Sequence, residues 1–280
     1  MNADRILDVE GVHNFRDFGG YPVVGGGRLK RGMLWRSGQH HGATDADLMK
    51  IAALGLASVM DLRSDQERAT YPCRRPEGFA ATVLIAADEL AQAAHAPEKK
   101  AEDAAPHVAA AQAPHIAAAQ RPVDGDGAAA FASMKRSYIG LPFRPELIKA
   151  MRGYIASVAE GAGPSLVNCM AGKDRTGVAV AMLQHAVGVH RDDILEDYLL
   201  TNTAGNVEKR IAEGMVSVRS LVGNLSDEFM RVLLGVDQAY LDTAFAAMAE
   251  KYGSVENYMK EALGVDDAMR EKLKKVLVEA

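Results

Sequence analysis

The chain has 280 residues, of which 48% are hydrophobic and 25% are charged, so it is long enough and apolar enough to bury a sizeable core. Its formal net charge of -5 argues against non-specific nucleic-acid binding, which needs a basic surface. The two cysteines, Cys73 and Cys169, are too few for a disulfide framework and indicate a reducing compartment. Residues 1–8 lack the apolar run of a signal peptide, and no stretch reaches the roughly 18 consecutive apolar residues of a membrane helix. We therefore expect a cytoplasmic protein without an integral membrane segment, with export that needs no signal peptide as the alternative.

The first part of the chain alternates turns, strands and one helix. Glycines and a proline within residues 19–27 predict turns. Thr44 is a predicted N-cap, and the helix that it begins runs to about Leu54, where Gly55 stops it. Three apolar runs predict strands over residues 33–36, 56–62 and 80–85.

Residues 86–130 differ from the rest in composition, because alanine dominates them. Alanine favours helix, whereas the four prolines of this segment each end or kink one. Few large apolar side chains are present to dock the segment on a core. Two interpretations stay open: a surface insertion of short helices, or a disordered linker.

The second half of the chain begins with a further apolar run, which predicts a strand over residues 164–168, directly before Cys169. Amphipathic patterns then predict helices over most of residues 191–280, with new helices beginning near Ser226, Asp237 and Val255. Strands that alternate with helices are typical of an α/β fold. We expect a central sheet with helices packed on it, in a single domain over residues 1–280.

The loop after the predicted strand carries the chemistry. It reads Cys-Met-Ala-Gly-Lys-Asp-Arg over residues 169–175, and a helix is expected to begin near Thr176. Such a loop can curl into a cup whose backbone N–H groups form an anion nest, and Gly172 gives the backbone freedom that the curl needs. The positive end of the helix dipole adds to the attraction for an anion. Arg175 offers a planar fork that can hold two phosphate oxygens at once.

The same positive environment favours the thiolate form of Cys169, which is the nucleophilic form of a thiol. A thiolate can attack phosphorus and form a covalent phosphocysteine that is later hydrolysed. Thr176 could place its hydroxyl near the sulfur and stabilise the thiolate as it leaves. Asp174 could protonate the departing oxygen as a general acid.

Other interpretations of this loop fail. A nucleotide-binding loop of the Walker type needs glycine where Val167 stands and serine or threonine where Asp174 stands. Cys169 has no Cys or His partner nearby in the sequence that would make a zinc site. A lone cysteine is most often a small buried side chain, but the Lys-Asp-Arg-Thr-Gly sequence after Cys169 argues against that role.

The loop resembles that of the cysteine phosphatases with a Cys-x5-Arg signature. More narrowly, it is similar to the bacterial tyrosine phosphatases with a Cys-x-x-Gly-Lys-Asp-Arg-Thr-Gly loop, a family of dual- or triple-specificity type related to the mycobacterial secreted phosphatase B. Matching segments occur in order along most of the chain, at residues 14–20, 35–38, 60–64 and 252–258.

The resemblance implies a protein tyrosine phosphatase-like α/β domain with a mostly parallel sheet, no metal and no cofactor. It assigns Cys169 as nucleophile, Arg175 as phosphate clamp and Asp174 as general acid. The implied substrate is a phosphorylated protein or a phosphoinositide, the latter suggested by Lys173, and the product is inorganic phosphate. Residues 86–130 stand where some relatives carry a helical lid. The implied phosphate-binding residues are Met170, Ala171, Gly172, Lys173, Arg175 and Thr176.

One residue departs from the family pattern, because Asn168 stands where histidine usually precedes the nucleophile. Asparagine brings no positive charge, so we expect weaker activation of Cys169 and slower turnover. A catalytically weak protein that binds phosphorylated ligands is the alternative function, and a sulfurtransferase or arsenate reductase is a third. Asp61 is a possible supporting residue, either as a second candidate for the general acid or as the partner of an arginine.

Other polar residues near the motifs have supporting roles in this interpretation. Asn14, Arg16 and Asp17 are expected to brace loops rather than to react. Arg36 and Arg63 are candidates for supporting the phosphate cup, with surface ion pairs as the alternative.

Overall fold

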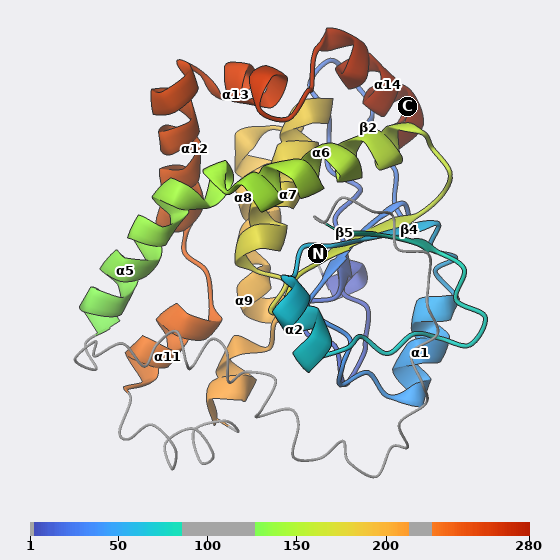
Figure 1. The fold of residues 1–280 in the computed structure, drawn as a ribbon, viewed down its shortest axis with the longest axis vertical. Coiled ribbons are helices and arrows are strands. Elements are labelled where there is room, and N and C mark those ends of the chain that lie inside the picture. Colours follow the sequence, from blue (N-terminus) through green and yellow to red (C-terminus); the bar gives the residue numbers. More distant parts are fainter. Residues whose placement is uncertain (1–2, 86–126, 213–225) are drawn as a thin grey trace.

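A five-stranded sheet lies at the centre of the computed structural model, which describes residues 3–85, 127–212 and 226–280 (Figure 1). The strand order is β1-β3-β6-β4-β5, and every neighbouring pair is parallel except β1 with β3. This confirms the predicted α/β class with a mostly parallel sheet. The strands are β1 (Arg16–Asp17), β3 (Leu34–Ser37), β4 (Ser58–Asp61), β5 (Thr82–Ile85) and β6 (Ser165–Asn168).

The predicted strands are all present: three have shorter bounds, and the one predicted over residues 33–36 lies one residue later, at Leu34–Ser37. The run that was predicted from residue 164 begins at Ser165, because Pro164 has no N–H to contribute to a ladder. In register, Ser37 and Asp61 both pair with Asn168, so the carboxyl ends of three parallel strands meet at one edge of the sheet. A second, two-stranded sheet joins β2 (Arg28–Leu29) to β7 (Val278–Glu279).

Both faces of the main sheet are covered by apolar side chains. Leu166 packs in one buried cluster with residues of α1 (Asp45–Ala52), whereas its neighbour Val167 packs in the larger cluster with α6 (Pro145–Ala159) and α7 (Asp174–Val187). Successive residues of a strand point to opposite faces, so this split follows from the pleat. In Figure 1, α6 and α7 cross one side of the strands and α1 lies on the other.

A group of C-terminal helices packs around α5 (Gly127–Gly140), which contacts α11 (Asp227–Leu234) and α12 (Gln238–Tyr252). The predicted starts near Ser226 and Asp237 are confirmed, since both residues are N-caps whose side chains accept backbone N–H groups. Other helices whose bounds lie within the described residues are α8 (Arg191–Leu199), α9 (Thr201–Ala204), α13 (Val255–Glu261) and α14 (Asp267–Leu277), with 3-10 turns at Ala3–Arg5 and Leu141–Phe143.

Two helices begin with the same capping arrangement. Thr44 caps α1 as predicted, and Asp47 completes a capping box, although the helix ends at Ala52 rather than Leu54. Sequence analysis missed α2 (Asp65–Thr70), in which Ser64 and Glu67 form a second capping box. The Ser-x-x-Glu spacing is a recognisable start signal, but the helix has only six residues and no apolar stripe.

The predicted helical insertion or lid over residues 86–130 lies outside the described residues, except that residues 127–130 open α5. The helices that the structure does describe include none that is long and apolar enough to span a membrane.

Candidate active site

The loop that joins β6 to α7 follows the edge where three strands end. Helix α7 begins at Asp174, two residues before the predicted start, so Asp174 and Arg175 lie in its first turn. Gly172 has a φ of +68°, and a Cβ at this position would lie 2.4 Å from the carbonyl carbon of Ser37. Any side chain would therefore push the loop away from β3, which confirms the expected need for glycine.

The carbonyl groups of the loop are bonded to neighbouring segments. The Asn168 carbonyl accepts the Leu62 N–H at 2.8 Å, and the Met170 carbonyl accepts the Gln39 N–H at 3.0 Å. The backbone N–H groups of residues 170–176 donate no hydrogen bond to any residue that the structure describes. The loop thus keeps a row of free donors, which is the requirement for an anion nest.

Two buried side chains hold the Gly172 carbonyl by hydrogen bonds. Its carbonyl accepts hydrogen bonds from Asn14 Nδ2 at 2.6 Å and from Arg36 Nη2 at 3.0 Å. Asp197 of α8 anchors both arginines of this region: Arg36 Nη1 lies 2.6 Å from Oδ2 and Arg16 Nε lies 3.2 Å from Oδ1. Arg16 also donates to the side-chain oxygen of Asn14. Asn14 and Arg16, which were expected to brace loops, and Arg36, which was expected to support the phosphate cup, thus form one network.

This network buries two positive charges against one negative charge. Burial would raise the pKa of Asp197, but Arg16 and Arg36 outweigh it and lower that pKa. Burial and the charge of Arg36 lower the pKa of Arg16 to about 10. This network next to Gly172 carries a net positive charge, which adds to the attraction of the loop for an anion.

Asp197→Asn is expected to destabilise the protein by about 3–5 kcal/mol, because it leaves Arg16 and Arg36 buried side by side without a carboxylate. Urea unfolding followed by circular dichroism would measure the loss. Asp242→Asn is the matched control: Asp242 pairs with Arg191 at 2.6 Å but is half exposed, so it should cost less than about 1 kcal/mol. Equal losses for the two variants would contradict this account of the network.

Arg175 is aligned by a carboxylate on α2. Its Nη1 and Nη2 atoms lie 2.7 and 2.8 Å from the two oxygens of Glu67, and Nη1 also donates to the Leu62 carbonyl at 3.1 Å. These bonds use three of the five guanidinium N–H groups. Among the described residues nothing engages the other two, on Nε and Nη2, which form one edge of the fork. That edge can hold two oxygens of a phosphate.

Sequence analysis missed Glu67 as a site residue. Burial alone would raise the pKa of Glu67, but Arg175 and hydrogen bonds with Ser64 lower it to about 2. The ion pair is therefore fully present above the ordinary carboxyl pKa of about 4 and is lost only as the pH falls toward 2. The available signal was the capping box, since Glu67 also accepts the Ser64 N–H at 2.8 Å.

Glu67→Gln is expected to lower kcat/KM by about 10- to 100-fold, because Arg175 loses its charged, two-point support and its free edge is no longer fixed. Glutamine also satisfies a capping box, so α2 should stay folded. Steady-state kinetics would be compared with those of Asp65→Asn, a control in the same helix whose carboxylate pairs with Arg68 at the surface. A drop in Asp65→Asn as large as that in Glu67→Gln would contradict the proposed alignment.

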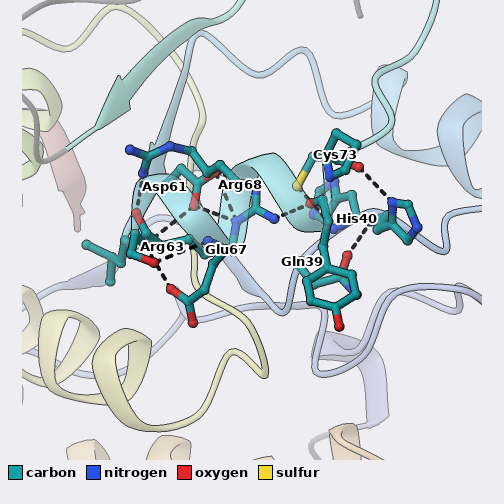
Figure 2. A network of polar contacts seen from close by, with 12 residues as sticks. Gln39, His40, Asp61, Arg63, Glu67, Arg68 and Cys73 are labelled. Carbon is teal, nitrogen blue, oxygen red and sulfur yellow. Dashed lines mark hydrogen bonds and ion pairs between the residues drawn. The ribbon is translucent and has the colours of Figure 1, made fainter. Parts of the chain in front are cut away.

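The carboxylate of Asp61 pairs with the guanidinium of Arg63 (Figure 2). Both oxygens are engaged: Oδ1 accepts Arg63 Nε at 2.9 Å, and Oδ2 accepts Nη2 at 2.7 Å. Of the two roles expected for Asp61, the structure thus supports that of partner to an arginine, and Arg63 also donates to the Tyr71 carbonyl at 2.6 Å.

The other cysteine of the chain also appears in Figure 2. Cys73 lies against His40, whose backbone N–H donates to the Cys73 sulfur at 3.3 Å.

The Lys173 ammonium is turned toward α11 and the loop after it. Nζ donates to the carbonyls of Leu233 at 2.7 Å and Gly235 at 3.1 Å, and the residue is only 3% exposed. Burial lowers the pKa of Lys173, and the charge of Asp174 opposes this. Lys173 can therefore serve an anion in the loop with its backbone N–H, while its side chain ties α11 to the loop.

Two polar side chains that flank the loop are buried without partners. Within the described part of the chain, Oδ1 and Nδ2 of Asn168 have no hydrogen-bond partner, and neither has Oγ1 of Thr176. The expected contact between the Thr176 hydroxyl and the Cys169 sulfur is thus not formed. Cys169 is itself only 3% exposed.

Asp174 has a partner that sequence analysis did not find. Its Oδ1 atom accepts a hydrogen bond of 2.6 Å from the hydroxyl of Tyr138 on α5. Cys169, Asp174 and Arg175 are brought together by the loop itself, whereas Glu67 and Tyr138 reach it from segments more than thirty residues away along the chain. Nothing local in the sequence indicates the contact with Tyr138.

Comparison with known proteins identifies the class. Residues 7–279 match the model of the tyrosine phosphatase family, so the chain belongs to that family. This confirms the resemblance seen at the loop and agrees with the α/β sheet and its flanking helices.

Two relatives cover nearly the whole chain. A protein of Cupriavidus necator, whose name gives tyrosine-protein phosphatase as a provisional assignment, is 33% identical over 266 residues, which is 94% of this chain and 85% of that protein. The triple specificity protein phosphatase PtpB of Mycobacterium tuberculosis is 31% identical over 287 residues, covering 98% of this chain and 99% of PtpB.

Proposed function

We propose that this protein hydrolyses phosphoric monoesters through a phosphocysteine intermediate on Cys169. The thiolate attacks phosphorus, so that an S–P bond forms while the P–O bond to the leaving group breaks. The proton of Asp174 passes to the leaving oxygen. Water then attacks the phosphocysteine and gives a proton back to Asp174, and the S–P bond breaks to release inorganic phosphate and the thiolate.

The observation that carries the proposal is the arrangement of unused donors around Cys169. The free N–H groups of residues 170–176 and the free edge of Arg175 converge on one short loop. Fixed donors of this kind stabilise the negative charge that builds on the phosphoryl oxygens in the transition state. These donors need no reorganisation during the reaction, because the hydrogen bonds of the loop carbonyls fix the N–H groups and Glu67 fixes Arg175.

The proposed substrates are phosphotyrosine proteins, with phosphoserine, phosphothreonine and phosphoinositides as further candidates. PtpB, one of the relatives, is named for triple specificity. A phosphoinositide preference that relies on the Lys173 ammonium would require its bonds to Leu233 and Gly235 to break. The structure therefore favours phosphotyrosine as the first substrate to test.

The test is hydrolysis of phosphotyrosine, phosphoserine, phosphothreonine and phosphoinositide substrates in the presence of a metal chelator, with acid-quench trapping of the phosphoenzyme from a radiolabelled phosphotyrosine peptide. We expect turnover with the chelator present and label on the peptide that contains Cys169. Turnover without a labelled Cys169 would overturn the phosphocysteine mechanism. Binding of the phosphopeptide without turnover would show that the protein binds phosphorylated ligands and is not an enzyme, which is the alternative function suggested by Asn168.

A further inference from the structure

Two buried tyrosines and the general-acid candidate form a chain of short hydrogen bonds. The Tyr138 hydroxyl lies 2.6 Å from Asp174 Oδ1 and 2.7 Å from the Tyr198 hydroxyl. Tyr138 is on α5 and Tyr198 is on α8, so three separate helices meet at this point. Both tyrosines are at most 1% exposed, which shields the chain from solvent.

The direction of these hydrogen bonds follows from the number of protons. Oδ1 of Asp174 accepts both when the group is a carboxylate and when it is a carboxylic acid with its proton on Oδ2, so Tyr138 uses its single hydroxyl proton on Asp174. At the other contact Tyr138 can then only accept, and Tyr198 is the donor. Burial and the charge of Asp174 raise the pKa values of Tyr138 and Tyr198 well above that of an exposed phenol, so both stay protonated donors in the physiological range.

Packing fixes both rings. The Tyr138 ring stacks on Tyr240 with centroids 5.4 Å apart. The Tyr198 ring lies against Gly177 in the first turn of α7, where an added Cβ would come within 2.7 Å of it. Gly177 thus has a role beyond helix start: it makes room for the ring that supports Tyr138. Neither hydroxyl can leave its place without disturbing a packed core.

The two oxygens of Asp174 have different surroundings. Oδ1 receives the Tyr138 hydroxyl and lies 3.8 Å from Lys173 Nζ. Oδ2 accepts no hydrogen bond from the residues that the structure describes, and the side chain is 23% exposed. Oδ1 is therefore the anchored oxygen and Oδ2 the one available to carry and transfer a proton.

We propose that Tyr138, supported by Tyr198, is a positioning residue that anchors Asp174 by Oδ1 and presents Oδ2 to the leaving oxygen of the substrate. This inference rests on the proposed function, because it gives Asp174 the role of general acid. It gives α5 an indirect part in catalysis, through Asp174, although α5 contributes no group to the phosphate loop. The loss of Tyr138 should therefore depend on the substrate: the rate falls more, the more the leaving group needs a proton from Asp174.

The test compares two aryl phosphates with different leaving groups. Phenyl phosphate releases a phenol with a pKa of about 10, like that of tyrosine, and depends strongly on protonation. Para-nitrophenyl phosphate releases a much more stable anion. For Tyr138→Phe we expect kcat/KM, which reports the release of the leaving group and not the later hydrolysis of phosphocysteine, to fall by about 10-fold or more on phenyl phosphate, because a general acid is typically worth about 10²–10⁴-fold. On para-nitrophenyl phosphate, kcat/KM should fall by less than about 2-fold.

Two further variants make the result specific. Asp174→Asn should show the same selectivity with a larger loss, and Tyr138→Phe added to it should cost nothing more on phenyl phosphate. Tyr154→Phe is the matched control, since Tyr154 is equally buried but bonds to Ser165 at the far end of β6, and it should leave both substrates unchanged.

Equal losses on the two substrates for Tyr138→Phe would overturn the positioning role and leave only a structural one. No loss on either substrate would also overturn it. A failure of the proposed function looks different, because the wild type would then turn over neither substrate or would do so without labelling Cys169. A wild type that is labelled at Cys169 and a Tyr138→Phe variant without selectivity would reject the inference alone.

Discussion

Cys169→Ser is expected to lower kcat on para-nitrophenyl phosphate by about 10⁴-fold or more, the scale on which enzymes lose activity when the nucleophile is removed. A serine hydroxyl stays protonated at neutral pH, and the loop places donors rather than a general base around it. The donors themselves should persist, because the loop carbonyls and Gly172 do not depend on the sulfur. Steady-state kinetics at high enzyme concentration would measure the residual rate.

The other cysteine supplies the control for this experiment. Cys73 is half-buried and accepts the His40 N–H, a bond that a serine oxygen can also accept, so Cys73→Ser should keep wild-type kcat. Tungstate binding measured by calorimetry should survive in Cys169→Ser, since N–H groups and Arg175 bind the oxyanion. Residual turnover above about one per cent of wild type would show that Cys169 is not the nucleophile.

Arg175→Lys is expected to lower kcat/KM by about 10³-fold, the cost of losing preorganised donors to a developing negative charge. Arginine meets Glu67 with one edge and offers a second edge to phosphate. An ammonium has no planar fork, so it cannot keep both oxygens of Glu67 and also direct two N–H groups at the phosphate. Tungstate affinity should fall together with kcat/KM, and calorimetry would record it.

Arg68→Lys is the matched control for the arginine substitution. Arg68 follows Glu67 on α2 and pairs with Asp65, which is exposed, so its replacement should change kcat/KM by less than about 2-fold. If Arg175→Lys kept wild-type kcat/KM, positive charge alone would be sufficient and the two-edged geometry of Arg175 would have no catalytic role.

The elements that local pattern determines could be predicted from the sequence. Apolar runs between turn residues located β3, β4, β5 and β6, and the caps at Thr44, Ser226 and Asp237 located helix starts. Gly172 was correctly given a backbone role, since a positive φ in a tight loop leaves glycine as the ordinary choice. The start of α7 was placed two residues late, because Lys173 at its N-cap makes no capping bond that a sequence would reveal.

The supports of the loop could not be predicted, because they come from distant parts of the chain. Asp197 and Glu67 look like ordinary surface carboxylates in sequence, and only the fold brings them to Arg36 and Arg175. Lys173 shows the opposite error: its place in the loop suggested contact with phosphate, yet its ammonium reaches carbonyls 60 and 62 residues away. The direction of a side chain is a tertiary property, and motif spacing does not encode it.

The short helix α2 has a consequence for how activity responds to heat. It has six residues and buries none of them, so it belongs to the part of the molecule that opens most easily, well before global unfolding. Glu67 nevertheless belongs both to the first turn of α2 and to the support of Arg175. Each fraying event of α2 would release the arginine while the core stays intact. Thermal inactivation should thus begin reversibly and at lower temperature than the melting of the sheet.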